Sequence, residues 1–111
     1  MQSNPVLTLI APSRALVVKD TLDAIDEKRL EVIKNALTNL GWSVQEAENL
    51  RSLDHRFAGS DAERARALEA VLTDGTTDLA LALRGGYGAS RLLPLLNWNA
   101  LSDSTVPFAG F

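Results

Sequence analysis

The fold is decided by one transition in the sequence, at residues 81–96, which read LALRGGYGASRLLPLL. The apolar run over residues 78–83 is typical of a strand that is buried on both faces of a parallel sheet. Three glycines follow within five residues, and glycine permits backbone conformations and close approaches that a Cβ would block. An amphipathic segment opens at Gly88 or Ala89. The stretch therefore predicts a strand, a tight turn and a short helix, which Pro94 bends or ends.

The same alternation of strands and helices extends over the rest of the chain. Apolar residues at helical spacing predict a helix from Asp23, as its N-cap, to Leu40, where Gly41 ends it. The capping-box pattern at residues 60–63 opens a second helix, which ends at Asp74-Gly75. Further strands are expected at residues 6–11, 42–47 and 106–111, and a short turn at residues 97–103.

This order of elements predicts an α/β fold, a flavodoxin/Rossmann-like parallel sheet of about four strands with helices on both faces. The expected strand order is 2-1-3-4, which places the topological switch point between the first and third strands. Ligands bind at such a point, outside the carboxyl ends of the strands. The loops expected to meet there are Pro12-Ser13-Arg14, residues 84–88 and whatever follows Phe111.

Composition limits the classes of function. The 111 residues suffice for one domain, and the net charge of −3 disfavours nucleic acid as a partner. The chain has no cysteine, which excludes disulfides, thiolate metal sites and a cysteine nucleophile. The N-terminal stretch MQSNPVLTLIAPSR lacks the features of a signal peptide or membrane span. A cytoplasmic protein without a membrane partner is therefore expected.

The glycine loop does not match the common nucleotide-binding patterns. Arg91 stands where a dinucleotide fingerprint needs its third glycine, and no Walker lysine follows Gly88. No cofactor and no metal are expected. Backbone N–H groups at the end of a strand and the start of a helix suit an anion or a developing oxyanion. A tight turn without a binding role is an equally open interpretation of Gly85, Gly86 and Gly88.

The other candidate side chains favour structural roles. His55, the single histidine, is expected to be a solvated loop residue, and Ser90 a helix cap. Ser13 ends the first strand, where it could bind a ligand or cap its own loop. Arg64 and Arg66 are expected on a solvated helix face.

The stretch RGGYGASRLLPLL, preceded in the chain by FAGSDAER, resembles the LD-carboxypeptidase family of serine peptidases. This family includes muramoyltetrapeptide carboxypeptidases and microcin C immunity proteins. IAPS after the first strand and VPFAGF at the end of the chain match in the family's order. The resemblance implies a cytoplasmic peptidase without a metal, which removes the terminal D-alanine from murein tetrapeptides during peptidoglycan recycling.

The family uses a Ser-Glu-His triad, whose serine lies in a Gly-x-Ser-Asp elbow between a strand and a helix. Gly110-Phe111 matches the first two positions of that elbow, so the nucleophile is expected directly after Phe111. The glutamate and histidine lie in a C-terminal domain in the family. Residues 1–111 are therefore expected to be the N-terminal domain of a two-domain enzyme, truncated or cleaved before the nucleophile and inactive alone.

By the same resemblance, the backbone N–H of Gly86, or of Gly85 beside it, helps to form the oxyanion hole. The expected substrate-binding residues are Ser13, Arg84, Gly85, Tyr87 and Gly88. The expected partners are the murein tetrapeptide, the chain's own C-terminal domain and a second copy in a homodimer. The alternative is a non-catalytic α/β module that binds a small anionic ligand at the Arg84–Gly88 loop.

Overall fold

The structure is a computed structural model that describes residues 4–18, 24–54, 57–84, 92, 94–102 and 104–109. Strands and helices alternate along the chain: β1 (Val6–Ile10), α1 (Glu27–Asn39), β2 (Ser43–Glu46), α2 (Asp61–Thr73), β3 (Leu79–Ala82), α3 (Trp98–Leu101) and β4 (Phe108–Ala109). All strand pairs are parallel, and the strand order is β2-β1-β3-β4. The predicted α/β fold and its strand order are confirmed.

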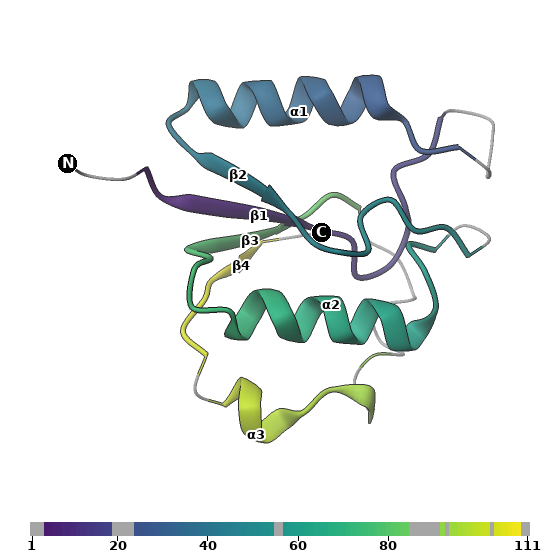
Figure 1. The fold of residues 1–111 in the computed structure, drawn as a ribbon, viewed down its shortest axis with the longest axis vertical. Coiled ribbons are helices and arrows are strands. Elements are labelled where there is room, and N and C mark those ends of the chain that lie inside the picture. The colour runs from purple at the N-terminus through teal and green to yellow at the C-terminus, as the bar shows by residue number, and fades with distance from the viewer. Residues whose placement is uncertain are drawn as a thin grey trace.

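Helices cover both faces of the sheet. Figure 1 shows α1 on one side of the strands and α2 and α3 on the other. Side chains alternate along β1, so that Leu7 and Leu9 pack in the cluster that includes α1, while Ile10 packs in the cluster that includes α2. This alternation explains why the apolar run has almost no polar positions, since both of its faces are buried.

The two core layers differ in the size of their side chains. Leucines dominate the layer next to α1, where Leu7 and Leu9 of β1 meet Leu30 of the helix. On the other face, Ala80 and Ala82 of β3 belong to the same cluster as residues of α2. Short side chains on a sheet allow a helix to pack close to it, because the side chains between the two layers set their separation.

Helix α1 begins later than the sequence pattern predicts. Its N-cap is Asp26, whose Oδ1 accepts a hydrogen bond from a backbone N–H of the first turn at 3.0 Å, whereas Asp23 lies outside the described residues. The helix cannot begin earlier, because Ile25 forms an antiparallel bridge with Val17 and cannot also be helical. At the other end Gly41 has a φ of +103°, as predicted for a glycine that ends a helix.

The C-terminal elements lie on the β3 side of the sheet. Strand β4 is short in the described chain, and its Phe108 pairs with Ala80 of β3 while remaining 52% exposed. Helix α3 falls within the predicted turn at residues 97–103. The helix predicted after the glycine loop would begin within residues 85–91, which lie outside the described residues.

Short polar side chains close the amino end of the sheet. The Asp74 carboxylate accepts hydrogen bonds from two backbone N–H groups of the turn before β3, at 2.9 and 3.0 Å. The hydroxyl of Thr77 donates to the same carboxylate at 3.0 Å and lies 2.8 Å from the hydroxyl of Thr8 in β1. Asp78 accepts from the backbone N–H of Val6 at 2.7 Å. These bonds fix the start of β3 against β1.

Candidate functional site

The carboxyl ends of β1 and β3 lie side by side, because Ile10 is in register with Ala82. From β1 the chain crosses to β2 on one side, and from β3 it crosses to β4 on the other. The topological switch point therefore lies between β1 and β3, as predicted. Figure 1 shows the loops after β1 and β2 at this end of the sheet, together with the first turns of α1 and α2.

The loop that follows β1 is pinned through its backbone. Ser13 is fully buried, and its carbonyl oxygen accepts a hydrogen bond from the backbone N–H of Ala58 at 2.9 Å. Arg14 pairs with Phe57 in an antiparallel bridge next to this bond. The loop after β1 and the loop before α2 thus form one short two-stranded contact at the switch point.

Arg64 holds the same two loops together from inside the molecule. Its side chain is only 1% exposed. Its Nε donates to the carbonyl oxygen of Pro12 at 3.1 Å, and its Nη1 donates to that of Gly59 at 2.7 Å. The guanidinium also pairs with Asp61 and lies over the Phe57 ring, 4.8 Å from the centroid. The charge is therefore compensated by acceptors and by a π face as well as by an acid.

This placement corrects the expectation that Arg64 lies on a solvated helix face. The buried position of Arg64 could have been predicted from the sequence. Arg64 precedes Ala67, Leu68 and Val71 by three, four and seven residues, which is the spacing of one helix face. Ala67 and Val71 are buried, so Arg64 is carried into the interior with them. Arg66 points the other way and is exposed, as expected.

The segment FAGS before α2 supplies the geometry that Arg64 needs. Ser60 and Glu63 form the predicted capping box, in which each side chain bonds the other residue's backbone N–H. Gly59 has a φ of +92°, and a Cβ there would lie 3.0 Å from the Glu63 carboxylate. Glycine is required at this position because a side chain would be strained and would displace the capping box.

Asn49 is a second buried link that sequence reasoning missed. Its amide nitrogen donates to the carbonyl oxygen of Ala11 at 2.9 Å and to that of Ala58 at 2.8 Å. The side chain is 3% exposed. No short motif marks such an asparagine, because its partners are backbone carbonyls distant in sequence. Arg64 and Asn49 together bind the loop after β1 to the loop before α2, and we call them the two loop-clamping residues.

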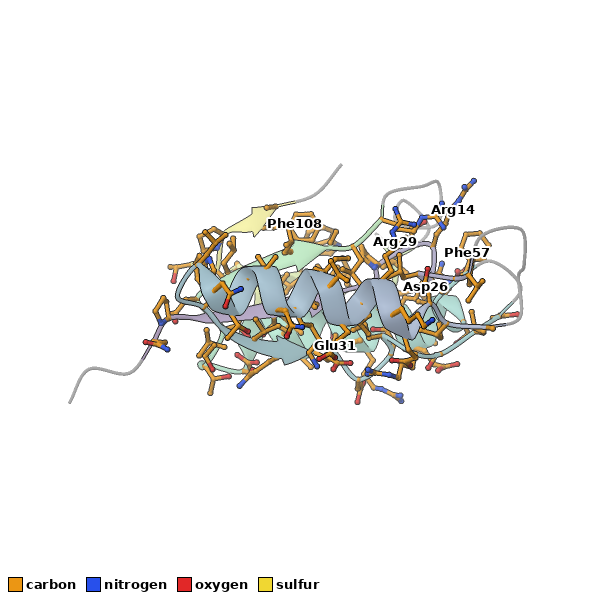
Figure 2. The ribbon with its side chains drawn as sticks, turned by 90° about the horizontal axis from the view of Figure 1, so that it is seen from above. Arg14, Asp26, Arg29, Glu31, Phe57 and Phe108 are labelled. Atoms are coloured by element: carbon orange, nitrogen blue, oxygen red, sulfur yellow. The ribbon has the colours of Figure 1, made fainter. Side chains whose placement is uncertain are left out.

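Arg84 reaches from the end of β3 toward the loop after β1. Its Nη1 lies 3.4 Å from the carbonyl oxygen of Ala15, and the side chain is half-buried. Figure 2 shows Arg14 and Phe57 at the same end of the molecule as Asp26 and Arg29, where α1 begins. The arginines that follow the two central strands therefore lie at the carboxyl end of the sheet, where a ligand is expected to bind.

Comparison with known proteins identifies the family. Residues 7–111 match the sequence profile described as the LD-carboxypeptidase N-terminal domain. The chain belongs to the LD-carboxypeptidase family. The resemblance drawn from RGGYG, FAGSDAER and the segments around them is therefore confirmed.

Individual relatives agree with this assignment. A Streptomyces coelicolor protein with the provisional name of carboxypeptidase is 33% identical over 108 residues, which are 92% of this chain and 34% of that protein. The crystal structure of muramoyltetrapeptide carboxypeptidase from Oxalobacter formigenes is 29% identical with a TM-score of 0.73, over 92% of this chain and 31% of that one. The chain spans about a third of the length of these LD-carboxypeptidase relatives.

A more distant likeness supports the fold alone. The structure of the microcin self-immunity protein MccF in complex with glutamyl sulfamoyl guanosine has a TM-score of 0.82 at 16% identity. The match covers 97% of this chain and 30% of that one. The four-stranded parallel sheet with its helices is thus the arrangement found in this solved structure.

The structure describes part of the predicted LD-carboxypeptidase site. Ser13 and Arg84 lie at the carboxyl end of the sheet, and the loop that contains Ser13 also provides the acceptor for Arg84. Their assignment to substrate binding stays a prediction. The remaining predicted residues lie outside the described residues, so their roles also stay predictions: Gly85, Gly86, Tyr87, Gly88 and Phe111, with the loop histidine His55 and the cap Ser90.

The described part of this LD-carboxypeptidase domain shows neither a membrane-spanning helix nor a cluster of metal-binding side chains. None of the helices found there has the length and apolar character that a membrane crossing needs. Across the same residues, no three or more histidine, aspartate or glutamate side chains gather in a way that could hold a metal ion.

Proposed function

We propose that this domain is the N-terminal part of a cytoplasmic serine-type LD-carboxypeptidase, which removes the terminal D-alanine from murein tetrapeptides in peptidoglycan recycling. The support is the family match over residues 7–111, which includes the glycine loop and the elbow positions Gly110-Phe111. A second, C-terminal domain completes the enzyme, and the intact protein is a homodimer. The domain alone is inactive because it holds no member of the triad.

The proposed reaction is acyl transfer through a covalent intermediate. The serine expected after Phe111 attacks the carbonyl carbon between the L-centre of the diamino acid and D-alanine, and the histidine takes the serine proton. The N–H of Gly86 stabilises the oxyanion that forms. The histidine then protonates the nitrogen of D-alanine, which leaves, and water hydrolyses the acyl-enzyme.

The geometry supports this assignment at the level of the scaffold. Parallel strands bring the carboxyl ends of β1, β3 and β4 to one end of the sheet, and the elbow positions come next after β4 in the sequence. The loop-clamping residues Arg64 and Asn49 hold the neighbouring loops in a fixed position. A site for acyl transfer needs loops held in this way, because a backbone N–H donor that is out of position loses most of its stabilising effect on the oxyanion.

The test is release of D-alanine from a murein tetrapeptide by the complete polypeptide and by residues 1–111 alone. We expect release by the complete polypeptide only, and none after replacement of the serine that follows Phe111 by alanine. If the complete polypeptide binds the tetrapeptide without releasing D-alanine, the protein is a non-catalytic module that binds anionic ligands at the Arg84–Gly88 loop.

A substitution in the glycine loop tests the oxyanion hole. Gly86→Val in the complete polypeptide keeps the backbone N–H, but its side chain should displace that donor from the oxyanion, so kcat is expected to fall by up to roughly 100-fold to 1000-fold with little change in melting temperature. Gly41→Ala, in a turn at the opposite end of the sheet, serves as the control for a glycine substitution, and its kcat should stay at the wild-type value. Wild-type kcat in Gly86→Val contradicts the proposed role.

A further inference from the structure

Two half-buried arginines at the switch point have no acidic partner among the described residues. Arg14 follows the last residue of β1 by four positions, and Arg84 follows the last residue of β3 by two. Because the Nη1 of Arg84 lies 3.4 Å from the carbonyl oxygen of Ala15, its guanidinium is next to the backbone of the residue that follows Arg14. Within the described part of the chain, neither arginine forms an ion pair.

The other described basic residues with buried or half-buried side chains contrast with this pair. Lys34, which is also half-buried, lies 2.8 Å from a carboxylate oxygen of Glu46, and the buried Arg64 pairs with Asp61. Among the exposed basic residues, Arg51 and Arg66 have acidic partners, whereas the well-solvated Lys28 and Arg29 form no ion pair within the described residues. The chain has 14 acidic residues against 11 lysines and arginines, so acids are not scarce. A guanidinium that is partly removed from water attracts an anion when no acid neutralises it.

We propose that Arg14 and Arg84 together form a subsite for the free terminal carboxylate of the peptide substrate. This inference rests on the proposed carboxypeptidase function, because a free carboxylate next to the scissile bond is what defines the substrate of a carboxypeptidase. A guanidinium binds a carboxylate through two parallel N–H donors, and two such groups can hold both of its oxygens. The pair lies at the switch point, where open α/β sheets bind their ligands.

The contacts leave both side chains available for a ligand. Arg84 uses a single N–H in its long bond to Ala15, and a guanidinium has five. Figure 2 shows Asp26 at the same end of the molecule as Arg14. The Asp26 carboxylate caps α1, where the positive end of the helix dipole offsets its charge. Asp26 and Arg14 form no ion pair in the described structure.

The test uses the complete polypeptide and a synthetic murein tetrapeptide in two forms, one with the terminal carboxylate and one with a carboxamide in its place. Release of D-alanine or D-alaninamide gives kcat and KM for each form. The wild type should prefer the carboxylate form about 10-fold or more in kcat/KM, the usual effect of a charge-assisted hydrogen bond. Arg14→Gln should remove most of that preference by raising KM for the carboxylate form. Arg14→Lys should remove less of it, because lysine keeps the positive charge but lacks the two parallel N–H donors of the guanidinium.

Arg66→Gln is the matched control, since it removes the same charge from an exposed arginine on α2. Its preference for the carboxylate form should equal that of the wild type, and thermal melting shows whether each variant is folded. An unchanged preference in folded Arg14→Gln, with wild-type behaviour in Arg66→Gln, overturns the subsite.

The subsite can still be tested if the complete polypeptide turns out not to be a carboxypeptidase. If the wild type releases neither product, the two peptides serve as unhydrolysed ligands in calorimetry. Tighter binding of the carboxylate form, which is lost in Arg14→Gln, then supports the subsite without the enzyme. Equal affinity of the wild type for the two forms overturns it.

Discussion

The two ends of the sheet are held by different kinds of polar contact. At the amino end, Asp74 accepts bonds from its own turn, while Thr77 and Asp78 reach across 69 and 72 positions of sequence to β1. At the carboxyl end, Arg64 reaches across 52 positions of sequence to Pro12, and Asn49 reaches across 38 positions to Ala11. The contacts at the amino end add to strands that the sheet already pairs, whereas the loops at the carboxyl end depend on a few buried side chains that bind backbone carbonyls.

This difference indicates where substitutions should act most strongly. Loops that bind ligands are long and irregular, so their backbone groups have few neighbours with which to pair. Buried side chains must satisfy those groups, and the loss of one such side chain leaves carbonyls without a partner. We therefore expect the stability of the protein to be more sensitive at the carboxyl end than at the amino end.

The largest effect is expected from Arg64→Leu. The substitution leaves the carbonyl oxygens of Pro12 and Gly59 without their donors and removes the packing on Phe57. The free energy of unfolding should fall by about 3–5 kcal/mol, as for other broken buried polar networks. Urea denaturation measures the change. Arg66→Leu on the exposed face should change it by less than about 0.5 kcal/mol, and equal effects in the two variants would refute the clamping role.

A smaller loss is expected from Asn49→Ala. This substitution removes the two bonds that join Ala11 to Ala58, and it leaves two buried carbonyls unpaired. The free energy of unfolding should fall by about 2–3 kcal/mol in the same assay. Asn35→Ala is the control, because Asn35 is exposed on α1 and alanine is the better helix former. A wild-type midpoint for Asn49→Ala would show that the loops are held by other contacts.

The smallest effect is expected at the amino end, from the carboxyl of Asp74. Burial raises its pKa, but hydrogen bonds from Thr76 and Thr77 outweigh that effect and leave the pKa below its ordinary value of 3.8. A lowered folded-state pKa adds stability that is present above pH 3.8 and is lost as the pH falls through the folded-state value. Because the group is largely exposed, screening keeps the contribution below about 1 kcal/mol.

Asp74→Asn provides the measurement, since asparagine keeps an acceptor oxygen and removes the titration. Urea denaturation of the wild type and the variant should differ at pH 6, and the difference should shrink at pH 3. A difference that stays constant between these two pH values would contradict a contribution from the ionised carboxyl.

The sequence predicted most of the scaffold. Apolar runs at residues 6–11 and 78–83 predicted the two central strands, and the capping box at residues 60–63 predicted the start of α2. These features were predictable because they depend on spacing and on neighbouring residues. The start of α1 was predicted wrongly, because the bridge between Val17 and Ile25 is a contact between residues that no local pattern connects.

The candidate site was less predictable than the scaffold. Arg64 was expected on the surface because arginine usually is, although its spacing from Ala67 and Val71 placed it on the buried face. Asn49 carried no signal, since its acceptors are carbonyls that only the fold brings near. Arg14 drew no functional expectation of its own, because its lack of an acidic partner among the described residues is visible only in the folded structure.

The loop after β1 is held in place through its own backbone carbonyl oxygens. Those of Ala11, Pro12 and Ser13 accept bonds from Asn49, Arg64 and the backbone of Ala58, respectively. Every amino acid has a carbonyl, so the shape of this loop does not depend on which side chain stands at position 14. Evolution can therefore diversify that position to retune ligand preference without rebuilding the scaffold, and a saturation library there should yield folded proteins of altered selectivity.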